Sequence, residues 1–164
     1  MPQVVSCFVD VHVFRYVDDG HGGRRDEWLL LKRAPHIRLG GTWQMVSGTI
    51  EAGEKAYQTA ARELLEETGL TPVHFYQVSY LNRFYLAATD EVVLTPVFAA
   101  EVPAGQAVRL SEEHTAHEWV APEEALRRYP WPGQRESLAV IREQFIHNEP
   151  RMESRIDALL AADI

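Results

Sequence analysis

Residues 48–70 read GTIEAGEKAYQTAARELLEETGL and join a glycine-bounded loop to a segment crowded with glutamates. Gly48 and Gly53 enclose four residues, as in phosphate-binding loops, but that template continues with Lys and then Ser or Thr. Here Glu54 and Lys55 follow, and a carboxylate at that place would repel a phosphate group. The loop is therefore not of that phosphate-binding type, and the chemistry of the stretch lies in its second half.

The second half predicts a helix from about Lys55 to Thr68 that ends at Gly69, a residue that favours the left-handed backbone of a helix C-terminus. Its apolar positions recur every three or four residues, as on a helix face that packs against a core. The expected core-facing stripe comprises Ala61, Leu64, Leu65 and Thr68.

Glu63, Glu66 and Glu67 share a different face of this helix. Like charges at these spacings destabilise a helix by about 0.2–0.5 kcal/mol per pair. Three carboxylates on one face are therefore unfavourable unless a cation binds them, and oxygen-only ligands suit Mg²⁺ or Mn²⁺ better than zinc. Taken alone, the cluster has a second interpretation as a solvated acidic helix face.

Composition excludes several classes of partner. The 164 residues suffice for one well-buried domain, and the net charge of −8 without a basic block argues against a nucleic-acid duplex. Cys7 is the only cysteine, which excludes disulfides within the chain and thiolate zinc sites. Asp10 interrupts the first apolar run, and no run approaches the roughly 18 apolar residues of a membrane span. We expect no membrane partner and a cytoplasmic location.

The order of the elements predicts one α/β domain with a mostly β framework. Residues 4–16 and 28–32 are expected to form a hairpin across a glycine-rich turn, and Pro96 makes its own strand an edge or bulged one. The remaining expected strands cover 43–47, 73–86, 91–102, 107–110 and 118–121. The remaining expected helices begin at Pro122 and cover 134–147 and 151–162, with a break at Pro150.

The glutamate-rich stretch resembles the Nudix hydrolase signature at every defining position. Gly48 is followed after five residues by Glu54, and after seven more by the run Arg-Glu-Leu-x-Glu-Glu-x-Gly-Leu at residues 62–70. The resemblance implies a single Nudix domain over residues 1–164, with its signature at 48–70 and C-terminal helices at about 134–162. The implied fold is an α/β/α sandwich, in which helices flank a central mixed β-sheet. The implied activity is hydrolysis of a diphosphate linkage with Mg²⁺ or Mn²⁺ as cofactor.

The same resemblance assigns roles to the residues of the signature. Glu63 and Glu67 are the implied main metal ligands, and Glu66 is a third or bridging ligand. Arg62 is expected to orient a carboxylate by a charge-assisted hydrogen bond, although a surface pair with Glu66 is the alternative. Glu54 is expected to support these residues without contacting the ion. The loop that starts at Gly48 brings the backbone close to the metal.

A further carboxylate is implied from the distant segment SEEHTAHEWV, residues 111–120. Glu113 aligns best as this fourth metal ligand, with Glu112 as its competitor and an exposed loop as the alternative to both. Whether Glu63 or Glu113 is the general base stays open. His114 and His117 are expected to be ordinary residues, because nothing else with zinc-like spacing accompanies them.

The segments TWQMVSGTIEAGE (42–54) and WPGQRESLAVIREQFI (131–146) are similar to a Nudix subset. That subset hydrolyses dihydroneopterin triphosphate and dATP to a monophosphate and pyrophosphate. By similarity Arg33, Ser47 and Gly48 would contact the triphosphate; the alternatives are a surface cation for Arg33 and a turn hydroxyl for Ser47. Trp43 would either stack on a purine or pterin ring or belong to the core.

Other substrates remain alternatives: oxidised nucleotides, ADP-ribose and dinucleoside polyphosphates. A sensor domain that binds a nucleotide without cleaving it is a further alternative, although such domains usually lose signature carboxylates. Pro132-Gly133 departs from the subset's shorter polar turn. The expected partner is a small nucleotide or pterin triphosphate, and a homodimer is possible.

Overall fold

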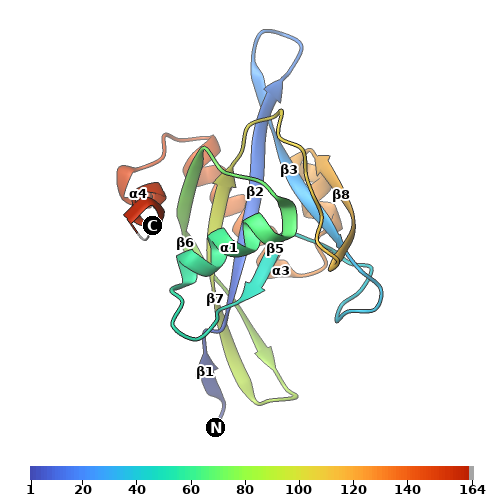
Figure 1. Cartoon of the computed structure of the whole chain (residues 1–164), viewed down its shortest axis with the longest axis vertical. Coiled ribbons are helices and arrows are strands. Elements are labelled where there is room, and N and C mark those ends of the chain that lie inside the picture. The colour runs from blue at the N-terminus through green and yellow to red at the C-terminus, as the bar shows by residue number, and fades with distance from the viewer. Residues whose placement is uncertain (163–164) are drawn as a thin grey trace.

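A mixed β-sheet with helices on both faces forms the framework of the chain, as Figure 1 shows for the computed structural model, which describes residues 1–162. The expected α/β/α sandwich is confirmed. The strands are β1 (Gln3–Val5), β2 (Phe8–Asp18), β3 (Arg24–Arg33), β4 (Trp43–Gln44), β5 (Val46–Thr49), β6 (His74–Leu86), β7 (Glu91–Glu101) and β8 (His114–Val120).

Strand β2 lies at the centre of the sheet. It pairs with β3 and β5 in antiparallel orientation and with β7 in parallel orientation. Strand β8 adds to the far side of β3, and β6 adds to the far side of β7. The expected hairpin of the first two long strands is therefore present as β2 and β3.

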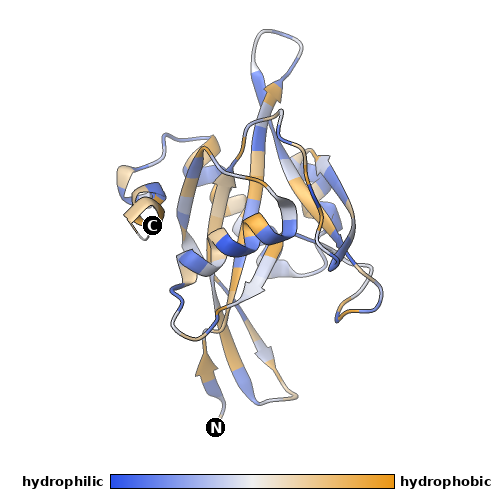
Figure 2. Ribbon diagram, in the orientation of Figure 1, coloured by the Kyte–Doolittle hydropathy of each residue, from blue (hydrophilic) through white to orange (hydrophobic). Residues whose placement is uncertain are grey.

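Two apolar clusters fill the two faces of the sheet. Val9, Val11 and Val13 of β2 point toward helix α1 (Ala56–Thr68) and pack with its Leu64. Alternate residues of the same strand point the other way, so that Phe14 packs with helix α3 (Pro132–Ile141) on the opposite face. Figure 2 shows the apolar residues concentrated along the strands that lie between these helices.

Helix α1 has nearly the predicted bounds, and Gly69 ends it in the left-handed conformation with φ 68°. Its buried residues are Thr59, Ala60, Leu64, Glu67 and Thr68. The expected stripe is therefore wrong at Leu65, whose side chain is 58% exposed. The helix is rotated about its axis so that Glu67, and not Leu65, faces the protein interior.

The other helices are α2 (Pro122–Arg128), α3 (Pro132–Ile141), the π-helical turn Arg142–Ile146, the 3₁₀ turn Met152–Ser154 and α4 (Asp157–Ala162). The expected helix over 151–162 is interrupted because the chain touches β6 there: Tyr76 forms an isolated bridge with Arg155, and the Ile156 amide donates to the Phe75 carbonyl. None of the helices in residues 1–162 is long and apolar enough to span a bilayer.

Two strand predictions need correction. Residues 107–110 form no strand; Val108 and Leu110 alternate because this loop anchors two apolar side chains beside α1, where the Arg109 amide donates to the Thr68 carbonyl at 2.8 Å. Of the two alternatives for the strand of Pro96, the edge is wrong, because β7 runs between β2 and β6, whereas the irregular pairing of a bulged strand is present. Pro96 lies beside a register shift of β6. It also lies between the segment of β7 that pairs with β1 and the segment that pairs with β2, so the missing backbone N–H of proline breaks no pairing there.

Candidate active site

Arg62 connects the glutamates of the signature into one network. Its guanidinium donates two hydrogen bonds to Glu54, at 2.8 and 2.9 Å, and a further nitrogen donates to Glu63 at 2.9 Å and to Glu66 at 3.1 Å. It also reaches the carbonyl of Thr49 at 3.3 Å, on the strand before the loop. Both contacts expected for Arg62, with a carboxylate of the signature and with Glu66, are present together.

Glu54 holds the loop against the start of α1. Its carboxylate accepts from Arg62 and, at 2.7 Å, from the hydroxyl of Thr59. The bonds from Arg62 are the main cause that lowers the pKa of Glu54 to about 2. Glu54 therefore stays ionised and holds the guanidinium that donates to Glu63.

Glu67 is the most deeply buried carboxyl group of the signature, with a side chain that is 4% exposed. Its pKa is raised to about 9, first by burial and then by the nearby charges of Glu63 and Glu113. It accepts a hydrogen bond from the Ser47 amide, yet within residues 1–162 its Oε2 atom has no hydrogen-bond partner. An inward-facing carboxyl oxygen without a partner is unfavourable in a metal-free protein and suited to a cation.

Glu63 lies where α1 faces β5. Its side chain is 15% exposed, and burial raises its pKa, opposed by Arg62. This contact requires glycine at residue 48, because a Cβ atom there would overlap the Cγ and Cδ atoms of Glu63. Glu66 differs, since its side chain is 57% exposed and stands at the edge of the cluster.

The distant loop brings a further carboxylate to the same place. Strand β8 pairs with β3, so that Arg33 lies opposite His114, and the Ala34 amide donates to the Glu113 carbonyl at 2.8 Å. Glu113 lines the same cavity as Glu63, whereas Glu112 does not. The placement therefore favours Glu113 over its competitor.

His114 was expected to be an ordinary residue, but its side chain is buried beside Glu67, with its Nε2 atom 3.8 Å from Glu67 Oε2. Burial lowers the pKa of His114 to about 4, so that it stays neutral at physiological pH. No spacing in the sequence marks this contact, because it depends on the pairing of β8 with β3.

A cavity of about 960 Å³ opens beside these carboxylates, a size typical of sites for small ligands. Of the residues predicted to bind substrate or metal, it is lined by Arg33, Ser47, Gly48, Glu63 and Glu113. Trp43 is not among its lining residues. The Trp43 ring packs against the apolar cluster beside α3, with the Arg128 guanidinium 5.0 Å from its centre. Of the two roles left open for Trp43, its placement matches the core role and does not support stacking on a substrate.

The floor and one wall of this cavity come from residues that the sequence did not mark as functional. Asp10 of β2, Asn82 of β6 and Thr95 of β7 lie on neighbouring strands, and all three are buried. The turn that contains Trp131 forms part of the wall at the start of α3. The one available signal was Asp10, a charged residue between the apolar Val9 and Val11 of β2.

The carboxylates gathered here have the chemistry of ligands for a hard divalent ion. Glu63, Glu67 and Glu113 offer only oxygen atoms, and they repel one another enough to raise the pKa of Glu67. As the side chains of residues 1–162 stand, no three His, Cys, Asp or Glu groups form a ready-made metal cluster. Glu63 is held by Arg62 instead, and the partnerless Oε2 atom of Glu67 is the position that a cation would satisfy.

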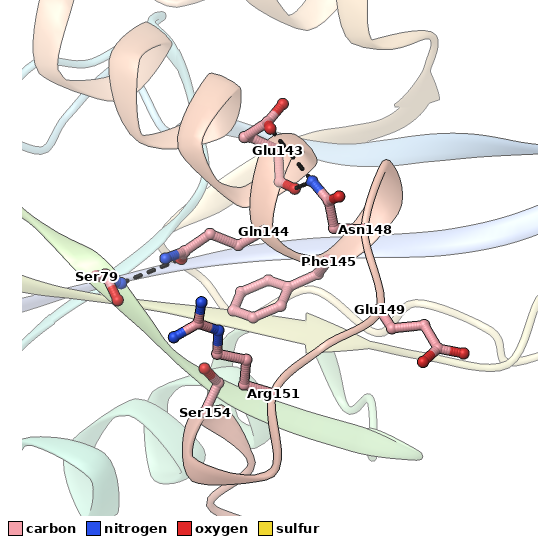
Figure 3. A pocket seen from close by; sticks show the side chains of 8 residues that line it. All are labelled: Ser79, Glu143, Gln144, Phe145, Asn148, Glu149, Arg151 and Ser154. Atoms are coloured by element: carbon pink, nitrogen blue, oxygen red, sulfur yellow. Dashed lines mark hydrogen bonds between the residues drawn. The ribbon is translucent and has the colours of Figure 1, made fainter.

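A second cavity, of about 680 Å³, lies between β6 and the C-terminal turns (Figure 3). Its walls are largely polar: the Gln144 side chain accepts from the Ser79 amide, and Asn148 donates to the carbonyl and carboxylate of Glu143. None of the residues predicted from the signature lines it. The candidate active site is therefore the larger cavity beside α1.

Relatives of known name match most of the chain. An octanoyltransferase from Myxococcus xanthus is 45% identical over 112 residues, which are 67% of this chain and 30% of that protein. A MutT-like protein from Streptomyces ambofaciens is 34% identical over 61% of this chain and 58% of its own length. A bis(5'-nucleosyl)-tetraphosphatase from Mus musculus is 31% identical over 60% of this chain and 67% of its own length. The chain thus spans under a third of the first of these proteins and somewhat over half of the second.

Solved structures share the fold. The MutT protein from Methanosarcina mazei superposes with a TM-score of 0.66 at 27% identity, over 88% of this chain and 97% of its own. The dihydroneopterin triphosphate pyrophosphohydrolase of Escherichia coli superposes with a TM-score of 0.62 at 22% identity, over 85% of this chain and 96% of its own. The sequence profile of the NUDIX domain covers residues 9–141, which include α1 and, except for Phe8 at the start of β2, every strand residue that lines the cavity. The chain therefore belongs to the NUDIX domain family.

Proposed function

We propose that the chain is a pyrophosphohydrolase that uses Mg²⁺ or Mn²⁺ to cleave a diphosphate linkage in a nucleoside triphosphate-like substrate, releasing a monophosphate and pyrophosphate. NUDIX hydrolases generally use such divalent ions. The observation that carries the proposal is that Glu63 and Glu113 line a nucleotide-sized cavity, while Glu67, with a partnerless oxygen, lies buried close enough to both for their charges to raise its pKa.

Glu63, Glu67 and Glu113 would hold the ion, and Glu66 at the exposed edge would be a further or bridging ligand. When bound, the ion neutralises phosphate oxygens and lowers the pKa of water. Arg62 keeps Glu63 in place through a hydrogen bond of 2.9 Å. Either Glu63 or Glu113 takes the proton of the attacking water, because both line the cavity.

Arg33 is the cation best placed for the phosphate chain. It lines the cavity next to Glu113, and its Nε atom donates to the Arg38 carbonyl at 2.9 Å, which leaves its terminal nitrogens for phosphate oxygens. The Ser47 hydroxyl bonds to Asp10, and its expected contact with the phosphate chain stays a prediction. The Ser47 amide, bonded to Glu67, ties the cavity floor to the carboxylates of α1.

The finer substrate proposal, dATP or dihydroneopterin triphosphate, rests on the likeness of residues 42–54 and 131–146 to the subset that cleaves these compounds. The curated relatives support a broader class by their names, which include a tetraphosphatase and nucleoside triphosphatases. The likeness to the Escherichia coli pyrophosphohydrolase, at 22% identity, supports the fold alone.

A substrate panel tests the proposal. dGTP, dATP, dihydroneopterin triphosphate, ADP-ribose and diadenosine tetraphosphate are incubated with the protein and Mg²⁺, and the phosphate products are separated. We expect pyrophosphate as a product of the triphosphates, and no product in the presence of EDTA. Glu67→Gln should lower kcat by more than about 100-fold, since even the loss of a group that only supports a metal ligand lowers activity by about 10–100-fold. Turnover unchanged in Glu67→Gln would refute the catalytic assignment. Tight nucleotide binding without any cleavage would identify a sensor instead.

A further inference from the structure

The floor of the cavity contains a carboxyl group that the proposed reaction does not use. Asp10 is 4% exposed and lines the cavity on the α3 face of the sheet, the face opposite to the valines that pack on α1. Its Oδ2 atom accepts from Asn82 Nδ2 at 3.0 Å, and a further bond comes from the Ser47 hydroxyl. In the described part of the chain no cation contributes to its environment.

A carboxylate has about four acceptor positions, and the two protein bonds use only two of them. Burying such a group without a cation is unfavourable, and burial raises the pKa of Asp10 to about 6. Asp10 is therefore still mostly ionised at neutral pH. Two acceptor positions of an ionised carboxylate remain for whatever occupies the cavity.

The neighbours of Asp10 fix its direction. A Cβ atom at Gly133 would overlap Asn82 Oδ1, so the first turn of α3 packs directly on this amide and keeps its nitrogen toward Asp10. Thr95 pairs with Asn82 across β6 and β7, and its buried hydroxyl has no partner within residues 1–162. The cavity floor is thus a rigid polar surface with unused hydrogen-bonding capacity.

Apolar side chains surround this polar floor. Phe8, Phe84 and Trp131 line the same cavity, and both Phe84 and Trp131 are exposed. Aromatic walls around a polar floor suit a flat heterocycle whose edge hydrogen-bonds to the floor. The phosphate chain of the same ligand would extend toward Glu63 and Glu113, which line the cavity too.

We propose that Asp10 is the specificity-determining residue of the site and selects a heterocycle with two adjacent N–H donors on one edge. The 2-amino-lactam edge shared by guanine and pterin has this pattern, with a ring N–H beside an exocyclic amino group. It can bind a carboxylate through two parallel hydrogen bonds, as a guanidinium does. The corresponding adenine edge presents one donor beside a ring nitrogen lone pair, which the carboxylate repels.

This inference rests on the proposed function for the position of the phosphates, and it narrows the substrate toward guanine or pterin triphosphates and away from dATP. It also assigns a role to Pro132-Gly133, the departure from the related subset: the glycine leaves room for the Asn82 amide that positions Asp10.

Equilibrium binding of dGMP, dIMP and dAMP in the presence of Mg²⁺ tests the inference, because these monophosphates contain no anhydride and are not consumed. Hypoxanthine keeps the ring N–H of guanine and lacks the amino group. Since a hydrogen bond to a charged group is worth about 1.5–3 kcal/mol, we expect dGMP to bind at least about 10-fold tighter than dIMP and about 100-fold tighter than dAMP.

Asp10→Asn is expected to reduce the preference for dGMP over dAMP to about 3-fold or less. The matched control is Glu51→Gln, which removes an exposed carboxylate at the rim of the same cavity and should keep the preference. Wild-type protein that binds dAMP as tightly as dGMP, or an Asp10→Asn variant that keeps the guanine preference, would overturn the inference. If Asp10→Asn does not fold, the comparison of dGMP with dIMP on the wild type still decides.

Cleavage of dGTP and dATP is measured separately, so that the two proposals fail in different ways. Guanine-selective binding without cleavage of any triphosphate would refute the proposed function and support the inference. Cleavage of both triphosphates at equal kcat/KM would refute the inference and support the proposed function.

Discussion

Replacing Glu67 with Gln is expected to stabilise the metal-free protein by an amount that grows with pH. The pKa of Glu67 is raised from 4.5 to about 9 in the folded protein, so the folded state binds a proton that the unfolded state releases above pH 4.5. Stability contributed by this group is therefore present at low pH and is lost as pH rises toward 9. Gln cannot ionise, so the Glu67→Gln variant does not lose this stability as pH rises.

The magnitude follows from about 1.4 kcal/mol per pH unit. Between pH 4.5 and 7.5 the predicted difference between variant and wild type rises by about 4 kcal/mol, an order-of-magnitude figure because carboxylates that lie close together titrate together. Urea denaturation of both proteins in EDTA at pH 5, 6, 7 and 8 measures this difference, from which the titrating groups that do not interact with Glu67 cancel.

The matched control is Glu66→Gln, which removes an exposed carboxylate one residue away and is expected to change stability by less than about 1 kcal/mol at each pH. Added Mg²⁺ should stabilise the wild type and leave Glu67→Gln nearly unchanged. A difference between Glu67→Gln and wild type that is the same at pH 5 and pH 8 would show that Glu67 is not the buried, partnerless group described above.

Three further substitutions have defined outcomes. Arg62→Lys should lower kcat by at least about 10-fold with little change in KM, since one ammonium cannot replace a planar guanidinium that bonds several carboxylates at once; normal kcat would refute the orienting role. Gly48→Ala should displace the Glu63 side chain and lower kcat by about 10–100-fold with native circular dichroism, and wild-type kcat would show that Glu63 tolerates the move. Leu64→Ala should destabilise the fold by about 2–5 kcal/mol in urea titrations, whereas the exposed Leu65→Ala should cost less than about 1 kcal/mol; equal losses would contradict the orientation of α1.

The fold was predictable from the sequence wherever local pattern and burial agree. The β2–β3 hairpin, α1 with its C-terminal Gly69 and the proline-started α2 follow from turn residues, periodicity and helix-end preferences. The prediction failed at residues 107–110, where alternation reflects a loop pinned to α1 and not a strand. Periodicity alone does not distinguish the two, because both place every second side chain inward.

The site was predictable where the signature defines it and not elsewhere. Leu65 was expected in the core and Glu67 on a face different from the core-facing stripe, but the helix turns Glu67 inward. Hydrophobic periodicity assumes that burial maximises apolar contact, and a functional carboxyl group violates that assumption. Asp10 and Asn82 escaped notice for another reason: they are 72 residues apart in sequence, and only the sheet order brings them together.

Calorimetric titration of the protein with Mg²⁺ at pH 7.5, in two buffers of different ionisation enthalpy, tests the role of the α1 carboxylates most directly. With the pKa of Glu67 at about 9, the metal-free side chain carries a proton at this pH, and a bound cation must displace it. The account predicts that the wild type takes up Mg²⁺ and releases about one proton per protein, and that Glu67→Gln releases none. Uptake without proton release, or release that persists in Glu67→Gln, would contradict it.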